Sequence, residues 1–184
     1  MAALPDAAQA SAQRRTCRSE ENDIIVFGID PGVTGAIACL VNGEVHSVRD
    51  LPVRLEGTGT VKRKLDSAGL AAIVRDWRQQ IGQDAEMAVI EKVASMPKQG
   101  VASVFSLGHS AGVCEAVMQA LWCRVEFVAP RTWKTAVGCG ADKATSAARA
   151  SLLYPRAAGY WSTKSGHNRA EALLLAHWGW VLKC

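Results

Sequence analysis

The chain has 184 residues, of which 49% are hydrophobic and 21% are charged, and its formal net charge is +4. This length accommodates one domain with a sizeable core and is too short for two domains of ordinary size. We expect a soluble globular protein without a membrane segment, because no uninterrupted apolar run approaches the roughly 18 residues that span a bilayer. The mildly basic balance is compatible with a polyanionic partner but does not require one.

Residues 1–22 are rich in Ala, Gln, Ser and Arg and are predicted to be a disordered extension of a single domain at residues 23–184. The arginines of the extension resemble the end of an organellar transit peptide, whereas its acidic residues, Asp6, Glu20 and Glu21, argue against one. The six cysteines lack metal-ligand spacing and are interpreted as reduced thiols of an intracellular protein.

An unbroken run of β-branched and aromatic residues, Ile24–Ile29, leads directly into Asp30 and the glycine-rich turn Pro31–Gly35. Continuous apolar character is typical of a central strand that is covered on both faces. Asp30 would then lie beyond the end of this strand, where α/β proteins place their sites. The motif alone is equally compatible with an aspartate that only initiates a turn.

Two apolar stretches flank Asn42-Gly43, which predicts a hairpin, so the chain is expected to open with three antiparallel strands. Residues 52–64 lack periodicity and are predicted to be a mobile connection. It ends in a basic group that either is solvated or contacts a phosphate backbone, namely Lys62, Arg63 and Lys64.

Asp66 and Gly82 bracket apolar residues at helical spacing, which predicts a capped amphipathic helix. Glu86–Glu91 is then interpreted as a strand that is apolar until it reaches Glu91. A helical crossover connects parallel strands, so we expect Glu91 beside Asp30 at the same sheet edge.

A long helix is predicted at residues 101–121, after a loop at residues 93–100. Gly108, Gly112 and Ala116 recur every four residues in this helix and form a smooth face. Such a face suits packing on the sheet or a dimer interface. Of the two, packing on the sheet is the favoured interpretation, because helix interiors keep glycine only for a reason.

Arg124–Val128 is expected to be the fifth strand, and Pro130 and Asp142 each begin a predicted helix. A basic, aromatic loop at Arg156–Gly166 precedes a final helix from about His167 to Val181. The expected fold is therefore α/β, with a five-stranded mixed sheet flanked by helices. Three antiparallel strands followed by two parallel strands with helical crossovers is the ribonuclease H-like order.

The final helix is apolar almost all round, yet Glu171 lies in its middle and His167 lies one turn earlier on the same face. An ionised carboxylate in such surroundings costs several kcal/mol unless it is paired or binds a cation. One interpretation is that Glu171 pairs with Lys164 or Arg169 and that His167 has no role.

The other interpretation joins Glu171 and His167 to the carboxylates at the strand ends, Asp30 and Glu91. Together they form an oxygen-rich cluster suited to Mg²⁺ or Mn²⁺. Two such ions about 3.5–4 Å apart can activate water and stabilise the leaving oxygen in phosphodiester hydrolysis.

Six motifs in a fixed order connect these residues: GIDPGVTGAIA at Gly28–Ala38, VIEKV at Val89–Val93, MPKQGVASVFSLG at Met96–Gly108, TWK at Thr132–Lys134, DK at Asp142–Lys143 and HNRAEALLLA at His167–Ala176. In these motifs the chain resembles the RuvC-type Holliday junction resolvases over roughly residues 24–180. It is most similar to their phage-like and plastid branch, which includes the monokaryotic-chloroplast resolvases.

The resemblance implies a catalytic site with two Mg²⁺ or Mn²⁺ ions, held by Asp30, Glu91, Glu171 and His167. It also implies that Lys134 and Lys143 approach the scissile phosphate or the nearby backbone, Lys143 as a member of the catalytic group.

The chain departs from this family at two places. Relatives have Asp-His-Gly where this chain reads Gly166-His167-Asn168. His167 would therefore be a neutral nitrogen ligand, which favours Mn²⁺, or a general base. The bacterial enzyme of this family has a protruding aromatic residue near the junction centre, where this chain reads Ala94-Ser95-Met96. Either the chain lacks a wedge, or Met96 or the tip at Lys98-Gln99 inserts instead.

The activity implied is that of a crossover junction endodeoxyribonuclease, a homodimer that makes paired symmetric nicks in four-way DNA junctions without a nucleotide cofactor. DNA contacts are expected from Lys62, Arg63, Lys64, Met96, Lys98, Gln99, Arg131, Lys134, Lys143, Lys164 and Arg169. The alternatives are a junction-binding protein with weakened catalysis, a related nuclease of other branched or hybrid nucleic acids, and an actin-like ATPase or sugar kinase. The expected location is a chloroplast, or otherwise a bacterial cytoplasm or a phage.

Overall fold

A computed structural model describes residues 23–56, 62–85, 87–95, 99–140, 143–163 and 166–183, with the backbone alone at Lys62, Lys143 and Ala144. The predicted extension at residues 1–22 and the predicted helix cap at Asp142 lie outside these residues. The strands are β1 (Ile25–Asp30), β2 (Ala36–Val41), β3 (Glu44–Asp50), β4 (Val53–Glu56), β5 (Lys62–Leu65), β6 (Met87–Glu91) and β7 (Arg124–Val128). The helices are α2 (Ser67–Ile81), α3 (Val101–Ala120), α4 (Pro130–Val137), α5 (Lys143–Leu153), the 3₁₀ helix η1 (Pro155–Trp161) and α6 (His167–Lys183).

The predicted five-stranded mixed sheet is confirmed, in the order β3-β2-β1-β6-β7. β1 is antiparallel to β2 and parallel to β6, and β6 is parallel to β7. The predicted hairpin between β2 and β3 is also confirmed, because Asn42 and Gly43 have φ angles of 52° and 75°, the left-handed values that such tight turns require.

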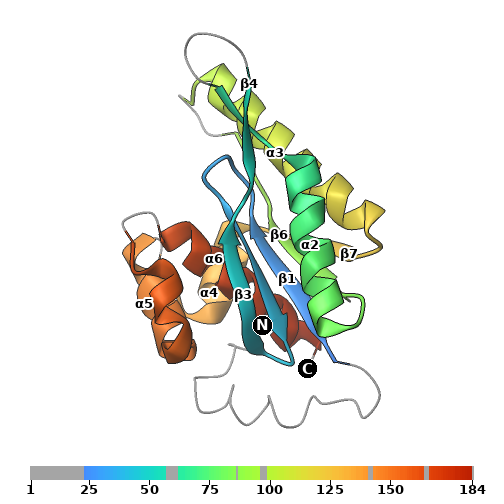
Figure 1. Ribbon diagram of the computed structural model, residues 1–184. Helices are drawn as coiled ribbons and strands as arrows, with labels where there is room; N and C mark the ends of the chain where they lie inside the picture. Colours follow the sequence, from blue (N-terminus) through green and yellow to red (C-terminus); the bar gives the residue numbers. More distant parts are fainter. Residues whose placement is uncertain are drawn as a thin grey trace.

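Helices cover both faces of the sheet, with α6 behind it and α2 in front of it in Figure 1. Alternate residues of β1 pack into the two hydrophobic clusters on opposite faces of the sheet. Val26 belongs to the cluster with α6, whereas Phe27 and Ile29 belong to the cluster with α2 and α3. β1 is therefore the buried central strand that its continuous apolar run predicted.

Close packing of α6 on β1 depends on Gly28, because an added Cβ would overlap Ala172 O and Ala176 N of that helix. Gly28→Ala is therefore expected to reduce the free energy of unfolding by about 2–3 kcal/mol. Urea denaturation measures this change. Gly159→Ala is the control and should cause no loss, since a Cβ there meets nothing within 4 Å. Equal stability of the Gly28 variant and wild type would contradict the packing described.

Residues 52–64 differ from the predicted loop, because β4 and β5 form a separate antiparallel hairpin, with Val53 opposite Leu65 and Glu56 opposite Lys62. This hairpin and the N-terminal half of α3 project beyond the end of the sheet (Figure 1). The predicted loop at residues 156–166 also differs, because its first part forms η1.

The predicted packing of the glycine face of α3 on the sheet is wrong. Gly108 and Gly112 face open space, and the same side of the helix carries the exposed side chains of Val101 and Phe105. The buried side of α3 is instead formed by Ser110, Ala111, Cys114 and Met118. The glycines are thus available to a partner and are not needed for intramolecular contact.

By length and composition, α3 is also the one helix of the described chain that could cross a membrane, with 22% of its most apolar 18-residue window buried. The sequence-based expectation of no membrane segment rested on uninterrupted apolar runs and stays a prediction. In this fold α3 packs against α2, β5, β6 and β7. Its exposed side therefore lies on the surface of the domain.

Candidate active site

Asp30 and Glu91 end two neighbouring parallel strands at the same edge of the sheet. Ile29 of β1 is paired with Ile90 of β6, so the residues that follow, Asp30 and Glu91, lie side by side. Side chains alternate between the two faces along a strand, and Val26 of β1 and Val89 of β6 face α6. Asp30 and Glu91 lie an even number of residues further along and therefore face the same way. Both carboxylates therefore belong to the α6 side of the sheet edge that the sequence predicted them to share.

Trp133 of α4 holds Glu91 in place. Its indole Nε1 donates a hydrogen bond of 2.9 Å to Glu91 Oε2, and its ring is fully buried. α4 begins at Pro130 and ends where Gly138 adopts a left-handed φ of 73°. One side of this short helix thus faces the core and directs a donor at the carboxylate.

Glu171 reaches the same region from α6 and is met by two donors. Lys134 Nζ lies 2.7 Å from its Oε1, and Ser146 Oγ of α5 donates to the same oxygen at 3.0 Å. The predicted alternative pairing of Glu171 with Arg169 is wrong, because Arg169 binds elsewhere; Lys164 lies outside the described residues.

The first turn of α6 is tied to the ends of the antiparallel strands. Arg169 Nε and Nη2 donate to the two carboxylate oxygens of Asp50 at 2.6 Å each, and Arg169 Nη1 donates to Tyr160 O at 3.1 Å. Asn168 Nδ2 donates to Thr34 O in the turn after β1 at 2.5 Å. These contacts orient the helix end that carries His167, which is half-buried, and they occupy the guanidinium predicted to bind DNA.

The Arg169–Asp50 pair should give the protein a pH-dependent stability. The hydrogen bonds from Arg169 lower the pKa of Asp50 below its usual 3.8, so this stabilisation is present above that value and is lost as the pH falls through the lowered pKa. Because the Asp50 side chain is 60% exposed, Asp50→Asn should cost at most about 1 kcal/mol at pH 7. Urea denaturation should show a smaller difference from wild type at pH 3, and an equal difference at both pH values would contradict this assignment.

The pKa of Glu91 is raised by its burial and by a second negative charge that lies near it at this edge. Burial raises the pKa of Glu91, and the nearby charge of Glu171 raises it further. The Trp133 hydrogen bond and the Lys134 charge act in the opposite direction. Two partly buried carboxylates thus lie within electrostatic reach of each other, a situation that a cation between them would relieve.

Carboxylates are the ligands that Mg²⁺ and Mn²⁺ prefer, and Asp30, Glu91 and Glu171 supply three of them from three elements. The residues present fit such an ion in donor chemistry. In the described part of the chain, however, no three His, Cys, Asp or Glu side chains are close enough to form a metal site as they stand. Glu171 in particular is engaged by Lys134 and Ser146.

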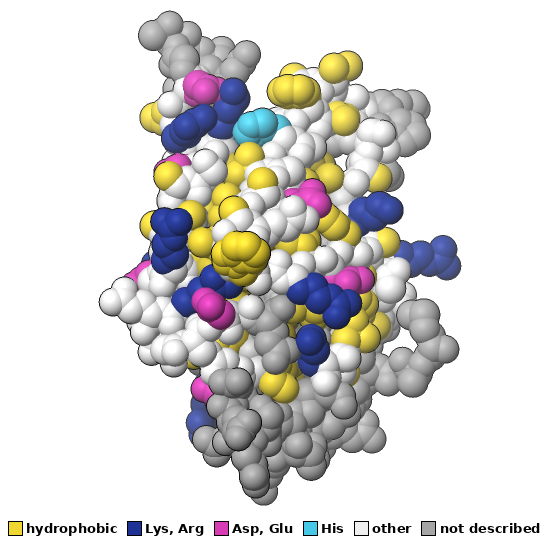
Figure 2. Space-filling view, turned by 90° about the vertical axis from the view of Figure 1, so that its right-hand side faces the viewer, with side chains coloured by type: hydrophobic (Ala, Val, Ile, Leu, Met, Phe, Trp, Pro, Cys, Tyr) yellow, Lys and Arg dark blue, Asp and Glu magenta, His cyan; other side chains and the backbone are white. Residues whose placement is uncertain are grey.

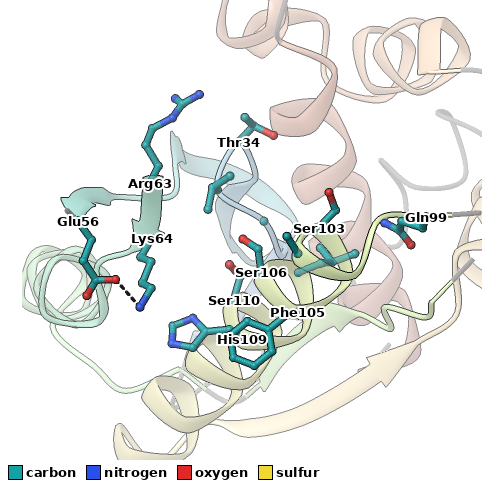
Figure 3. A pocket seen from close by; sticks show the side chains of 14 residues that line it. Thr34, Glu56, Arg63, Lys64, Gln99, Ser103, Phe105, Ser106, His109 and Ser110 are labelled. Atoms are coloured by element: carbon teal, nitrogen blue, oxygen red, sulfur yellow. Dashed lines mark ion pairs between the residues drawn. The ribbon is translucent and has the colours of Figure 1, made fainter. Parts of the chain in front are cut away.

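A groove of about 790 Å³ lies beside this edge, between the β1–β2 turn, the β4–β5 hairpin and the N-terminal half of α3 (Figure 3). Hydroxyl groups of Ser103, Ser106 and Ser110 line its α3 wall. Its hairpin wall carries Arg63 together with Lys64, which forms an ion pair with Glu56.

The structure places only some of the other residues that were predicted to contact DNA. Gln99 lines the groove and Arg131 is exposed on α4, while Met96, Lys98 and Lys164 lie outside the described residues. For Lys62 on β5 and Lys143 at the start of α5, the structure gives only the backbone position. The structure thus brings Asp30, Glu91, Glu171 and Lys134 to one region and leaves the role of Lys143 a prediction.

Three partners of these residues were not predicted from the sequence: Trp133, Ser146 and Asp50. Trp133 could have been found, because it precedes Lys134 on a short helix and an apolar ring there must face the sheet. Ser146 and Asp50 carry no local signal, since each meets its partner across a long separation in the chain.

Comparison with known proteins identifies the architecture. No protein-family model and no curated protein matches the chain. Among solved structures, it is similar to Thermus thermophilus RuvC, with a TM-score of 0.50 and 20% identity over 84% of this chain and 92% of that chain. The chain has the RuvC fold. A second similar structure, T. thermophilus RuvC in complex with a Holliday junction substrate, has 17% identity, a TM-score of 0.50 and the same coverage.

The RuvC fold is the ribonuclease H-like arrangement that the element order predicted. The likeness covers most of both chains. At 17–20% identity it defines the fold, and the chemistry has to be argued from the residues of this chain.

Proposed function

We propose that this protein is a divalent-metal-dependent endonuclease that resolves four-way DNA junctions. The observation that carries the proposal is the gathering of Asp30, Glu91 and Glu171 from β1, β6 and α6 at one sheet edge, within the RuvC fold. A related structure in complex with a Holliday junction substrate supports the choice of DNA substrate.

The three carboxylates would hold the ions, and His167 on the first turn of α6 would serve as a further ligand or as a general base. Bound ions supply an activated water and charge stabilisation of the leaving oxygen. Trp133 and Ser146 keep Glu91 and Glu171 oriented through hydrogen bonds of 2.9 and 3.0 Å. The burial of both donors excludes water from the back of the site.

A junction arm would extend from this site into the groove between the hairpin and α3. The serine hydroxyls of α3 and the basic side chains of Arg63 and Lys64 are the kinds of group that contact phosphates. Such contacts give recognition of shape and a strong dependence on salt.

A homodimer is part of the proposal, since paired nicks in a two-fold symmetric junction call for two sites related by the same symmetry. We assign the interface to the exposed side of α3. It carries Val101 and Phe105, which are 86% and 73% exposed, together with Gly108, Gly112 and Ala116. Hydrophobic side chains also spread over the middle of the face in Figure 2. Small residues let a second helix approach closely.

A substrate panel tests the proposed activity. Purified protein with Mn²⁺ should nick a labelled four-way junction and leave a matched linear duplex, a flap and an RNA–DNA hybrid largely intact. Preferential cleavage of the flap or the hybrid would instead assign the site to a different nuclease of the same fold. Junction binding without nicking of any substrate would favour the junction-binding alternative. The chloroplast location stays a prediction, which microscopy of a fluorescent fusion of the whole chain would test.

A further inference from the structure

Lys134 occupies a position from which a cation can neutralise the carboxylates at the sheet edge. Its Nζ lies 2.7 Å from Glu171 Oε1, and the two side chains are only 17% and 9% exposed. Its charge also acts on Glu91. A buried carboxylate requires such a counter-charge, because an uncompensated one costs several kcal/mol.

The backbone that carries Lys134 is fixed, whereas its side chain is long and flexible. The preceding residue, Trp133, anchors α4 to the core and to Glu91. Lys134 Nζ lies 5.2 Å from the centre of the Trp133 ring, within the range of a cation–π contact. The ammonium thus contacts Glu171 and the Trp133 ring at the same time. Because the four-carbon stem of lysine is flexible, a change of side-chain torsions alone can take the ammonium away from Glu171 without moving α4.

We propose that Lys134 is the resident counter-ion of the candidate metal site and that an entering divalent cation displaces it from Glu171. This inference rests on the proposed function, because it takes the carboxylate cluster to be a metal site. Glu171 would offer such an ion the oxygen that the ammonium now holds, and repulsion between the two cations would move the ammonium of Lys134 outward.

Displacement of the Lys134 ammonium would couple the binding of the metal ion to the binding of DNA. Without DNA, an incoming ion has to replace a charge-assisted hydrogen bond, which weakens its binding. A phosphate at the mouth of the site offers the released ammonium a new partner. Metal and DNA should therefore each strengthen the binding of the other by the same factor.

The test compares Mn²⁺ binding to DNA-free wild-type protein, Lys134→Met and Arg131→Met, measured by electron paramagnetic resonance of free Mn²⁺. Methionine retains much of the side-chain stem but removes the charge, and Arg131 is an exposed cation on the same helix. Lys134→Met should bind Mn²⁺ about tenfold more tightly, the worth of one charge-assisted hydrogen bond, yet nick the junction more slowly. Arg131→Met should bind Mn²⁺ as wild type does.

A second measurement needs no variant. Acylation of wild-type lysines, followed by mass spectrometry, should modify Lys134 severalfold faster with Mn²⁺ than without it. Equal or weaker Mn²⁺ binding by Lys134→Met, or unchanged labelling of Lys134, would overturn the proposal. Either outcome would refute only the displacement of Lys134 if wild type binds Mn²⁺ and Asp30→Asn does not, because the metal site itself would then be supported. If folded wild type binds no Mn²⁺, the metal-dependent function fails as well.

Discussion

Glu171→Gln is expected to slow nicking of a four-way junction by about 10³-fold, because several kcal/mol of charge stabilisation by a bound ion is lost with its ligand. Glutamine keeps the size of the side chain and still accepts hydrogen bonds from Lys134 and Ser146, so the fold should persist. Junction binding, measured by electrophoretic mobility shift, should remain close to that of wild type. Asp30→Asn should behave in the same way, because it removes a ligand from the same cluster.

Asp76→Asn is the matched control, since Asp76 is a surface carboxylate of α2 that is paired with Arg49. It should nick as fast as wild type. Nicking by Glu171→Gln and Asp30→Asn at the wild-type rate would remove both residues from the catalytic site, whatever the outcome of the binding experiment.

Gly112→Arg is expected to separate the homodimer. A charged side chain would be placed at the centre of the exposed α3 side, where a partner helix could no longer approach. Loss of an interface centre typically costs 2 kcal/mol or more, so the dissociation constant should rise by about 30-fold or more. Sedimentation equilibrium measures this shift, and circular dichroism should show an unchanged fold.

The control for this variant is Gly159→Arg, which makes the same substitution at another glycine with open space around it. It should leave the dissociation constant unchanged. A Gly112→Arg protein that dimerises like wild type would place the interface elsewhere on the surface. A wild-type monomer at all concentrations would remove the homodimer from the proposal.

The core of the site could be predicted from the sequence because its positions follow from chain order. Asp30 ends a continuous apolar strand, and a helical crossover makes the next strand parallel, which brings Glu91 to the same edge. Glu171 stands out as a single carboxylate in an apolar helix. Each of these inferences uses only local pattern and one topological rule.

The partners of these carboxylates could not be predicted in the same way. Lys134 meets Glu171 across a separation of 37 residues, and Ser146 meets it across 25. Such contacts depend on how α4 and α5 dock onto α6, and neither periodicity nor spacing encodes that docking. The sequence-based pairing of Glu171 with Arg169 was wrong for this reason.

Strand β4 and the packing of the glycine face of α3 were not predicted correctly, because each sequence pattern is compatible with two structures. Every residue of β4 is exposed, so this strand lacks the alternation that marks a half-buried strand. The spacing of Gly108 and Gly112 predicts a smooth helix face but does not say what the face meets. In this structure the glycine face of α3 contacts no other part of the described chain, so it is a candidate interface and not a packing surface.

The central claim is most directly tested by the products that wild-type protein forms from a four-way junction with Mn²⁺. We expect two nicks at symmetric positions in opposite strands, giving duplexes that DNA ligase can seal and that remain uncut without the metal. Cleavage that is independent of metal, or nicks scattered along a linear duplex as readily as on the junction, would contradict this account.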